Sequence, residues 1–176
     1  MSNKLTQERL QELFEYKDGD LYWRVQNSNR IKSGDKVSPN RKEGEVVQVG
    51  VDGTGFKLHR LIYLYFNKDF DIHNTKIQID HIDVDRNNNN IENLRVATNK
   101  ENNCNRKMQN NNTSGYKGVT HYPEGRKKCW LGYYKVDGKM YSKYFLTKEE
   151  AIEFSVNNRK HYHGDFFNEN YTRGDL

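Results

Sequence analysis

Residues 78–106 read QIDHIDVDRNNNNIENLRVATNKENNCNR, and their pattern predicts a small, specific fold. KIQIDHI predicts a strand that ends at the pair Asp80–His81, and NLRVAT predicts a second strand. The intervening DVDRNNNNIE contains residues that hydrogen-bond their own backbone and accept left-handed conformations, which indicates a loop. NKENNCNRKM predicts a helix with Thr98 as N-cap and Glu101 closing a capping box. The order is therefore strand, loop, strand, helix.

The Asp-His pair presents a geometric difficulty. Adjacent residues on a regular strand point to opposite faces, so Asp80 and His81 should not share a site. We therefore expect the strand to break at the pair, and Ile82 with the polar loop behind it favours such a break.

Each feature of this stretch also has an ordinary interpretation. An isolated Asp-His dipeptide is a common surface pair, and an asparagine-rich stretch is usually a polar loop or spacer. The joint pattern is more specific, since Asn93 of "NLR" follows His81 by twelve residues and Asn102 follows Asn93 by nine.

This segment resembles the HNH endonuclease family, built on the ββα-metal finger, and specifically its phage and intron-encoded homing branch. In that family an Asp-His pair ends the first strand, an Asn in "NLR" opens the second, and a His or Asn on the helix faces back to them. Asp80, His81, Asn93 and Asn102 fill those places. The ββα core then covers about residues 76–108.

The resemblance implies a role for each residue. His81 is the general base that activates water, because imidazole titrates near neutral pH. Asp80 and Asn102 hold Mg²⁺, with Mn²⁺ as a substitute, since carboxylate and amide oxygens are hard donors. Many family members have His in place of Asn102, and the Asn favours Mg²⁺ over softer ions. Asn93 ties the backbone of the loop so that His81 keeps one orientation, and one carbonyl among Asn87–Asn90 could fix the His81 tautomer.

The N-terminal part predicts short elements around an apolar core. Leu5 and Thr6 open a short helix that buries Leu10, Leu13 and Phe14. Three Asp-Gly pairs predict hairpin turns, at residues 18–19, 52–53 and 137–138. Residues 26–45 indicate an irregular surface connection, and 59–66 a short buried helix in which His59 is a packed or capping residue.

Residues 108–114 are polar and rich in turn formers, which favours a module boundary. Beyond it, three short antiparallel strands and a helix follow, with Thr147 and Glu150 in a capping box and Gly164 as the stop. Residues 114–164 resemble the APETALA-type (ethylene-response-factor) DNA-binding domain through "SGYKGV", Trp130, Phe145 and "TKEEA". Its sheet contacts the major groove, which implies DNA contacts from Lys117, Thr120, Lys127, Tyr133, Lys135, Lys139 and Tyr141.

That second resemblance has departures. The loop HYPEGRKKC is longer than in the plant proteins, and Lys replaces Arg at most contact places. Lys lacks the bidentate fork that reads guanine, so we expect loose sequence readout. A solvated, charged sheet face is the alternative interpretation.

Composition narrows the function classes. The chain has 176 residues, 34% hydrophobic and 30% charged, with a net charge of +5, which favours compact modules on a polyanion. Cys104 and Cys129 lack a second pair, so neither a zinc site nor a disulfide framework is indicated. No apolar run approaches the length of a membrane span. We expect a cytoplasmic protein, in the host cell if phage-encoded, and a monomer without a small-molecule cofactor or membrane partner.

The fold class predicted is α+β, with an HNH domain over 1–112 and an APETALA-type domain over 113–176. The predicted function is a site-specific homing endonuclease that hydrolyses double-stranded DNA. The alternative from another class is a non-catalytic, sequence-specific DNA-binding regulator. A third is an RNA-directed or structure-specific nuclease.

Overall fold

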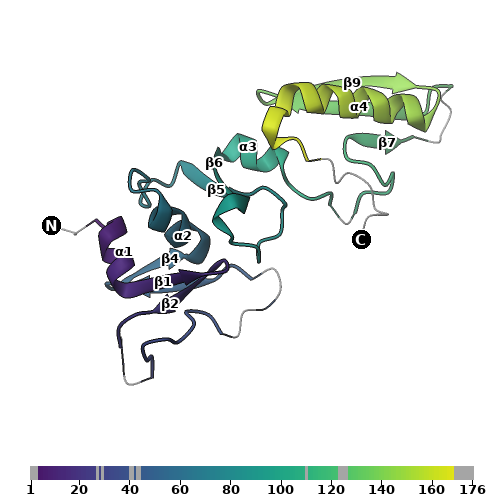
Figure 1. The fold of residues 1–176 in the computed structure, drawn as a ribbon. Helices are drawn as coiled ribbons and strands as arrows, with labels where there is room; N and C mark the ends of the chain where they lie inside the picture. The colour runs from purple at the N-terminus through teal and green to yellow at the C-terminus, as the bar shows by residue number, and fades with distance from the viewer. Residues whose placement is uncertain are drawn as a thin grey trace. The chain divides into compact units, whose positions relative to one another are not determined.

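The computed structural model describes residues 4–26, 28, 30–39, 42, 45–109, 111–122 and 127–168 (Figure 1). The chain forms two compact units, Met1–Asn99 and Lys100–Leu176. Within the described ranges the architecture is mixed α and β, with four α-helices and small antiparallel sheets. Parts of two predicted connections, at 27, 29, 40–41, 43–44 and 123–126, lie outside the described residues.

The first unit begins with a helix and two hairpins. Thr6 caps the first helix by accepting a hydrogen bond from the Arg9 backbone N–H at 3.3 Å. Asp18 and Asp52 adopt positive φ at the hairpin turns, which confirms these two predicted Asp-Gly turns. The elements are α1 (Gln7–Leu13), β1 (Phe14–Lys17), β2 (Asp20–Trp23), β3 (Gln48–Val51), β4 (Thr54–Lys57) and α2 (Leu58–Phe66).

The core of the first unit gathers around α2. Its apolar positions recur at helical spacing, so one side of the helix is buried: Leu58, Leu61, Ile62 and Leu64. Leu10 and Phe14 are also fully buried in this cluster. Each such side chain contributes about 1.5–3 kcal/mol through burial.

The hairpin that carries the Asp-His pair rests on the same core. β5 (Ile77–His81) pairs antiparallel with β6 (Leu94–Thr98), and the short 3₁₀ helix η1 (Ile91–Asn93) precedes β6. Ile79 and Leu94 belong to the core cluster. Arg60 of α2 donates to the carbonyl of Ile77 at 2.6 Å, which attaches the start of β5 to α2. The predicted strand–loop–strand order is confirmed.

The expected strand break at the Asp-His pair is wrong. β5 continues through His81, which lies opposite Leu94 in the ladder. The backbone N–H of Ile82 still donates to the carbonyl of Asn93 at 2.9 Å, and a turn follows at once, in which the Val84 N–H donates to the carbonyl of His81 at 3.0 Å. The turn comes at Val84, whose φ is 60°.

The second unit holds a three-stranded sheet covered by one helix. α3 (Asn99–Cys104) follows β6 directly, and residues from Lys100 onward belong to this unit. The helix is shorter than predicted. The remaining elements are β7 (Val119–His121), β8 (Trp130–Val136), β9 (Lys139–Phe145), α4 (Lys148–His163) and the 3₁₀ helix η2 (Gly164–Phe166). The strands pair in the order β7-β8-β9, as predicted, with a turn at Asp137 (φ 50°).

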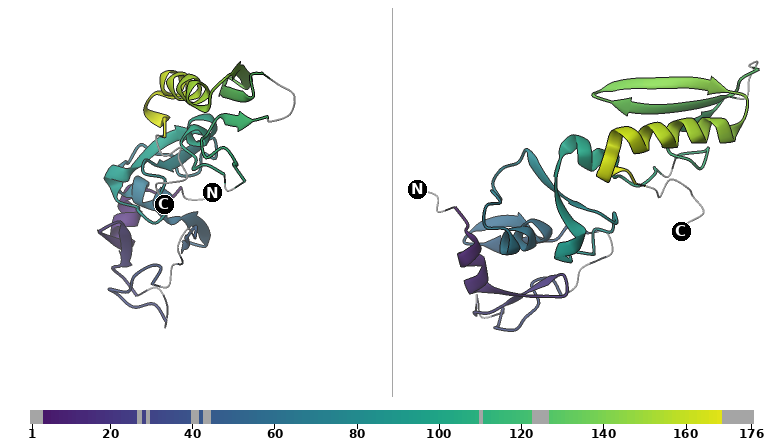
Figure 2. Two further views of the ribbon diagram at one scale, coloured as in Figure 1. Left: turned by 90° about the vertical axis from the view of Figure 1, so that its right-hand side faces the viewer. Right: turned by 45° about the horizontal axis from the view of Figure 1, so that its top comes forward.

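Helix α4 begins and ends as the sequence indicates. The capping box of Thr147 and Glu150 is present, and Gly164 is the C-cap. Figure 2 shows α4 lying along the sheet. Its buried positions, Ala151, Ser155 and Arg159, recur every four residues. Among the described residues, no helix combines the length and apolarity needed to cross a membrane.

Close packing of α4 on the sheet requires glycine at two places. A Cβ on Gly132 would lie 2.7 Å from the carbonyl oxygen of Ala151. A Cβ on Gly118 would lie against Ser155 Oγ and 2.5 Å from the carbonyl oxygen of Tyr133, and Gly118 has φ +82°. Neither carbonyl can move without disturbing the sheet or helix.

We expect Gly118→Ala to destabilise the second unit more than Gly115→Ala. Both positions have positive φ, +82° and +77°, but nothing lies within 4 Å of a Cβ at Gly115. Both variants therefore have the same backbone penalty. The difference between their free energies of unfolding measures the steric clash at Gly118, about 1–3 kcal/mol for overpacking. Urea unfolding of both variants measures it, and equal midpoints would contradict the close approach.

Candidate functional site

Two polar residues are buried side by side in sequence at the end of β5. Asp80 is 5% exposed and His81 is 7% exposed. Burying a charged or polar group is costly unless it has a hydrogen-bond or ion-pair partner. Asp80 and His81 each have such a partner.

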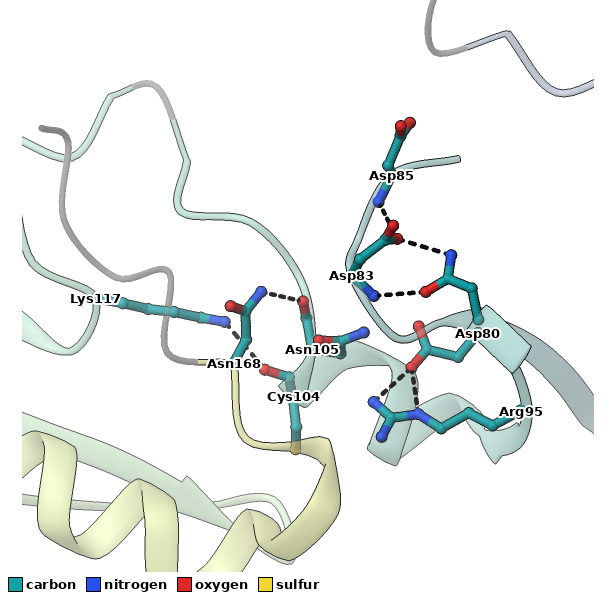
Figure 3. A network of polar contacts seen from close by, with 9 residues as sticks. Asp80, Asp83, Asp85, Arg95, Cys104, Asn105, Lys117 and Asn168 are labelled. Carbon is teal, nitrogen blue, oxygen red and sulfur yellow. Dashed lines mark hydrogen bonds and ion pairs between the residues drawn. The ribbon is translucent and has the colours of Figure 1, made fainter. Parts of the chain in front are cut away.

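Asp80 pairs with an arginine from the neighbouring strand. Arg95 donates from Nε at 3.0 Å and from Nη2 at 2.9 Å, both to Oδ2 of Asp80 (Figure 3). The two residues are directly opposed in the ladder, where cross-strand pairs of opposite charge are favourable. Arg95 was not predicted as a site residue, although "NLR" contains it, because its pairing with Asp80 follows only from the strand register.

His81 is oriented by the asparagine loop. Its Nε2 lies 2.8 Å from Oδ1 of Asn89, which is itself 3% exposed. An amide oxygen can only accept, so Nε2 carries the proton and the neutral ring has its lone pair on Nδ1. The expectation that one carbonyl among Asn87–Asn90 faces His81 is confirmed by Asn89.

The remaining polar groups of the loop hold each other. Asn93 accepts from the Asp83 N–H at 3.0 Å and donates to the Asn88 carbonyl at 2.7 Å. Asp83 accepts from the Asp85 N–H at 2.8 Å (Figure 3). Partial burial raises the pKa of Asp83, but hydrogen bonds from Asn88 and Asn93 outweigh it and lower the pKa overall. The loop is thus tied together through the side chain of Asn93.

His59 of α2 contacts the ring of His81. The ring centroids are 5.2 Å apart at 69°, an edge-on arrangement. Burial, helped by the neighbouring imidazole of His81, lowers the pKa of His59 to about 3. His59 is therefore packed and uncharged at neutral pH. The packed role of His59 was predicted, whereas its ring contact with His81 was not.

Register assigns the two residues of the pair to different faces. Directly opposed residues share a face, so Asp80 lies with Arg95 and His81 lies with Leu94. Asn102 lies on α3, in the second unit, and is partly buried. The first unit thus brings together His81 with Asn89, and Asp80 with Arg95.

The described residues offer few side chains that could bind a metal ion together. Among the described residues no group of three or more His, Cys, Asp and Glu side chains is placed to hold a metal ion. One carboxylate and one amide oxygen nevertheless suit Mg²⁺, which commonly keeps several waters and completes its shell with substrate phosphate. Asp80 and Asn102 fit that type of ion in donor chemistry.

The predicted DNA-contact residues are divided between the faces of the C-terminal sheet. Phe154 of α4 packs on Tyr134 at 5.7 Å between ring centroids, which identifies the helix-covered face. Lys139 lies opposite Val136 and Tyr141 opposite Tyr134, so both belong to that face. Thr120, Tyr133 and Lys135 lie on the open face, and Lys127 is exposed before β8.

Lys117 has a different environment from the others. Its amine donates to the carbonyls of Cys104 at 3.1 Å and Arg106 at 2.6 Å. Burial lowers its pKa to about 8. Its amine is therefore engaged within the fold.

Acid should weaken the first unit through His59. The unfolded chain takes up a proton as pH falls below the ordinary value of 6.5, while folded His59 resists until about pH 3. The free energy of unfolding should consequently fall across this window, by up to about 1.4 kcal/mol per pH unit. His59→Phe keeps the ring and removes the titration, so its stability curve should be flatter. Chemical unfolding at several pH values measures this, and parallel curves would contradict it.

Sequence comparison supplies the family. Residues 56–104 match the HNH endonuclease family, and this range contains His59, Asp80, His81 and Asn102. Protein 3.8 of Escherichia phage T7 is 36% identical over 90 residues, which cover 50% of this chain and 71% of that protein. No solved structure matches.

The predicted APETALA-type module finds no support in these comparisons and stays a prediction. The match over residues 56–104 covers helix α2, the β5–β6 hairpin and α3, the elements that carry the buried Asp-His pair and Asn102. The chain belongs to the HNH endonuclease family.

Proposed function

We propose that this protein is a site-specific DNA endonuclease of the homing type that hydrolyses phosphodiester bonds with a single divalent metal. The observation that carries the proposal is the buried, oriented imidazole of His81, which follows Asp80 in the sequence. A histidine held in one tautomer by a buried amide is arranged to accept a proton.

His81 acts as the general base in this proposal. Its Nε2–H is committed to Asn89, so the Nδ1 lone pair takes the proton from the attacking water. Asn93 acts on His81 indirectly, because its hydrogen bonds fix the loop from which Asn89 extends.

Asp80 and Asn102 would hold Mg²⁺, or Mn²⁺ in its place. The ion, when bound, stabilises negative charge on the phosphate and the leaving oxygen. Asp80 already neutralises its charge against Arg95 through Oδ2. Arg95 therefore competes for, or shares, the carboxylate.

The Asp80–Arg95 ion pair also favours a second candidate function. If the pair is only structural, the finger is a scaffold and the protein is a non-catalytic DNA-binding regulator. Buried ion pairs serve structure in many proteins, so their presence alone does not imply catalysis. Cleavage assays separate the two.

The proposal also assigns a role to each half of the chain and a partner to the protein. Residues 1–112 provide catalysis and 113–176 dock on double-stranded DNA through an APETALA-type sheet, with the protein acting as a monomer. The net charge of +5 supports a polyanionic partner. The relative from a phage supports a phage-encoded protein that acts in the host cytoplasm.

We expect His81→Ala, Asp80→Asn and Asn102→Ala to abolish most cleavage while binding of DNA in EDTA stays near wild type. General acid-base groups contribute roughly 10² to 10⁴ in rate, so His81→Ala should lose that much. Asp69→Asn, at an exposed acid outside the site, is the matched control. Cleavage of phage or host DNA with Mg²⁺, with melting curves for each variant, measures it.

The outcomes distinguish the candidates. Wild-type cleavage that survives His81→Ala would remove His81 from the mechanism. Specific DNA binding by a wild-type protein that cuts nothing with Mg²⁺ or Mn²⁺ would establish the regulator instead.

The docking face is tested by two lysines on opposite faces of the sheet. Lys135 is on the open face and Lys139 on the helix-covered face. Lys135→Ala should flatten the slope of log affinity against log salt by about 0.9, the value for one lost phosphate contact. Lys139→Ala should change it less. Salt titrations on one duplex measure both, and a larger effect at Lys139 would place DNA on the other side.

A further inference from the structure

Helix α3 is too short to be stable by itself. It spans six residues, Asn99–Cys104, and isolated helices need about 12–15 residues even in favourable sequences. The last carbonyls of any helix also lack partners within the helix. The residues that satisfy them therefore decide where α3, and Asn102 on it, is held.

One partner is Lys117, just before β7. Its ammonium group donates to the carbonyl of Cys104 at 3.1 Å (Figure 3) and also to that of Arg106 at 2.6 Å. A cation at the C-terminal end of a helix also interacts favourably with the helix dipole. Lys117 thus caps the end of α3.

A second partner comes from the other end of the unit. The side chain of Asn168, beyond η2, donates to the carbonyl of Asn105 at 2.8 Å. Asn105 is 2% exposed and Asn168 is 7% exposed, so this bond is shielded from water. The carbonyls of three consecutive residues, 104 to 106, are therefore held by side chains from before the sheet and from after α4.

Lys117 is itself fixed by α4. Its carbonyl accepts from Ser155 Oγ at 3.2 Å and from Arg159 Nη1 at 3.3 Å. Ser155 and Arg159 are both buried on α4. A continuous set of bonds therefore runs from α4 through Lys117 to the end of α3.

We propose that Lys117 and Asn168 are positioning residues of the metal site, which hold α3 and so place Asn102. This inference rests on the proposed function of Asn102 as a metal ligand. The contacts that carry it all lie within the C-terminal unit. It also removes Lys117 from the set of DNA contacts, because its amine serves α3.

The test uses the full chain and four variants. Lys117→Met keeps the length of the side chain without its donor, and Lys117→Arg keeps a charged donor. Asn168→Leu removes the second contact at similar volume. Lys128→Met, an exposed lysine of the same unit, is the matched control. Mn²⁺ affinity by calorimetry and the salt slope of duplex binding in EDTA are measured, with melting curves for each protein.

We expect Lys117→Met and Asn168→Leu to weaken Mn²⁺ binding about 10- to 100-fold, the usual effect of losing a residue that orients a ligand. Their salt slopes should equal that of wild type, since no phosphate contact is lost. Lys117→Arg should recover part of the affinity, and Lys128→Met should bind Mn²⁺ as wild type does.

Two results would overturn the inference. One is unchanged Mn²⁺ affinity in both folded variants, and the other is a shallower salt slope for Lys117→Met, which marks a DNA contact. If Lys117→Met does not fold, Asn168→Leu decides alone. The variant Asn102→Ala tests the proposed ligand separately. If Asn102→Ala binds Mn²⁺ as tightly as wild type does, Asn102 is not a metal ligand. If Asn102→Ala loses Mn²⁺ affinity while Lys117→Met and Asn168→Leu keep it, only the positioning role is rejected.

Discussion

The hydrogen bond between His81 Nε2 and Asn89 Oδ1 is the interaction on which the proposed chemistry depends. A buried imidazole without a fixed partner could exchange tautomers and present either nitrogen. The 2.8 Å contact removes that freedom, and the edge-on ring of the neutral His59 limits the orientation further. The asparagine-rich loop places the Asn89 amide oxygen at this nitrogen, while the side chains of Asn93 and Asp83 accept hydrogen bonds from backbone N–H groups of the loop.

The hairpin could be predicted because its signals are local. The period-two pattern ends at the polar pair, and the loop residues form their own hydrogen bonds, so strand, loop and strand follow from neighbouring residues. The Asp-Gly turns and the capping box of α4 were predictable for the same reason. The presence of a loop carbonyl at His81 was also expected, although no local signal selected Asn89.

Contacts that depend on register or on distant segments could not be predicted. Arg95 reaches Asp80 only because the two are opposed across the hairpin, and a shift of one residue would separate them. The expected strand break failed because the bond from Ile82 to Asn93 extends the ladder, which sequence does not reveal. Lys139 looked equivalent to Lys135 until pairing assigned them to opposite faces.

The division of the chain into units changes which half contains α3. A boundary after residue 112 would leave α3 with the catalytic half, whereas α3 from Lys100 onward folds with the C-terminal unit. Side chains that look like surface lysine and asparagine in sequence then satisfy the end of a helix. The position of Asn102 within the C-terminal unit accordingly depends on contacts inside that unit.

The central claim is that His81 is held as the Nε2–H tautomer, with its lone pair on Nδ1. Long-range ¹H–¹⁵N correlation spectra of the imidazole ring measure this directly in the wild-type protein. The account predicts a protonated-type shift for Nε2 and a lone-pair-type shift for Nδ1, with this preference lost in Asn89→Leu. A proton on Nδ1 in the wild-type protein would contradict it.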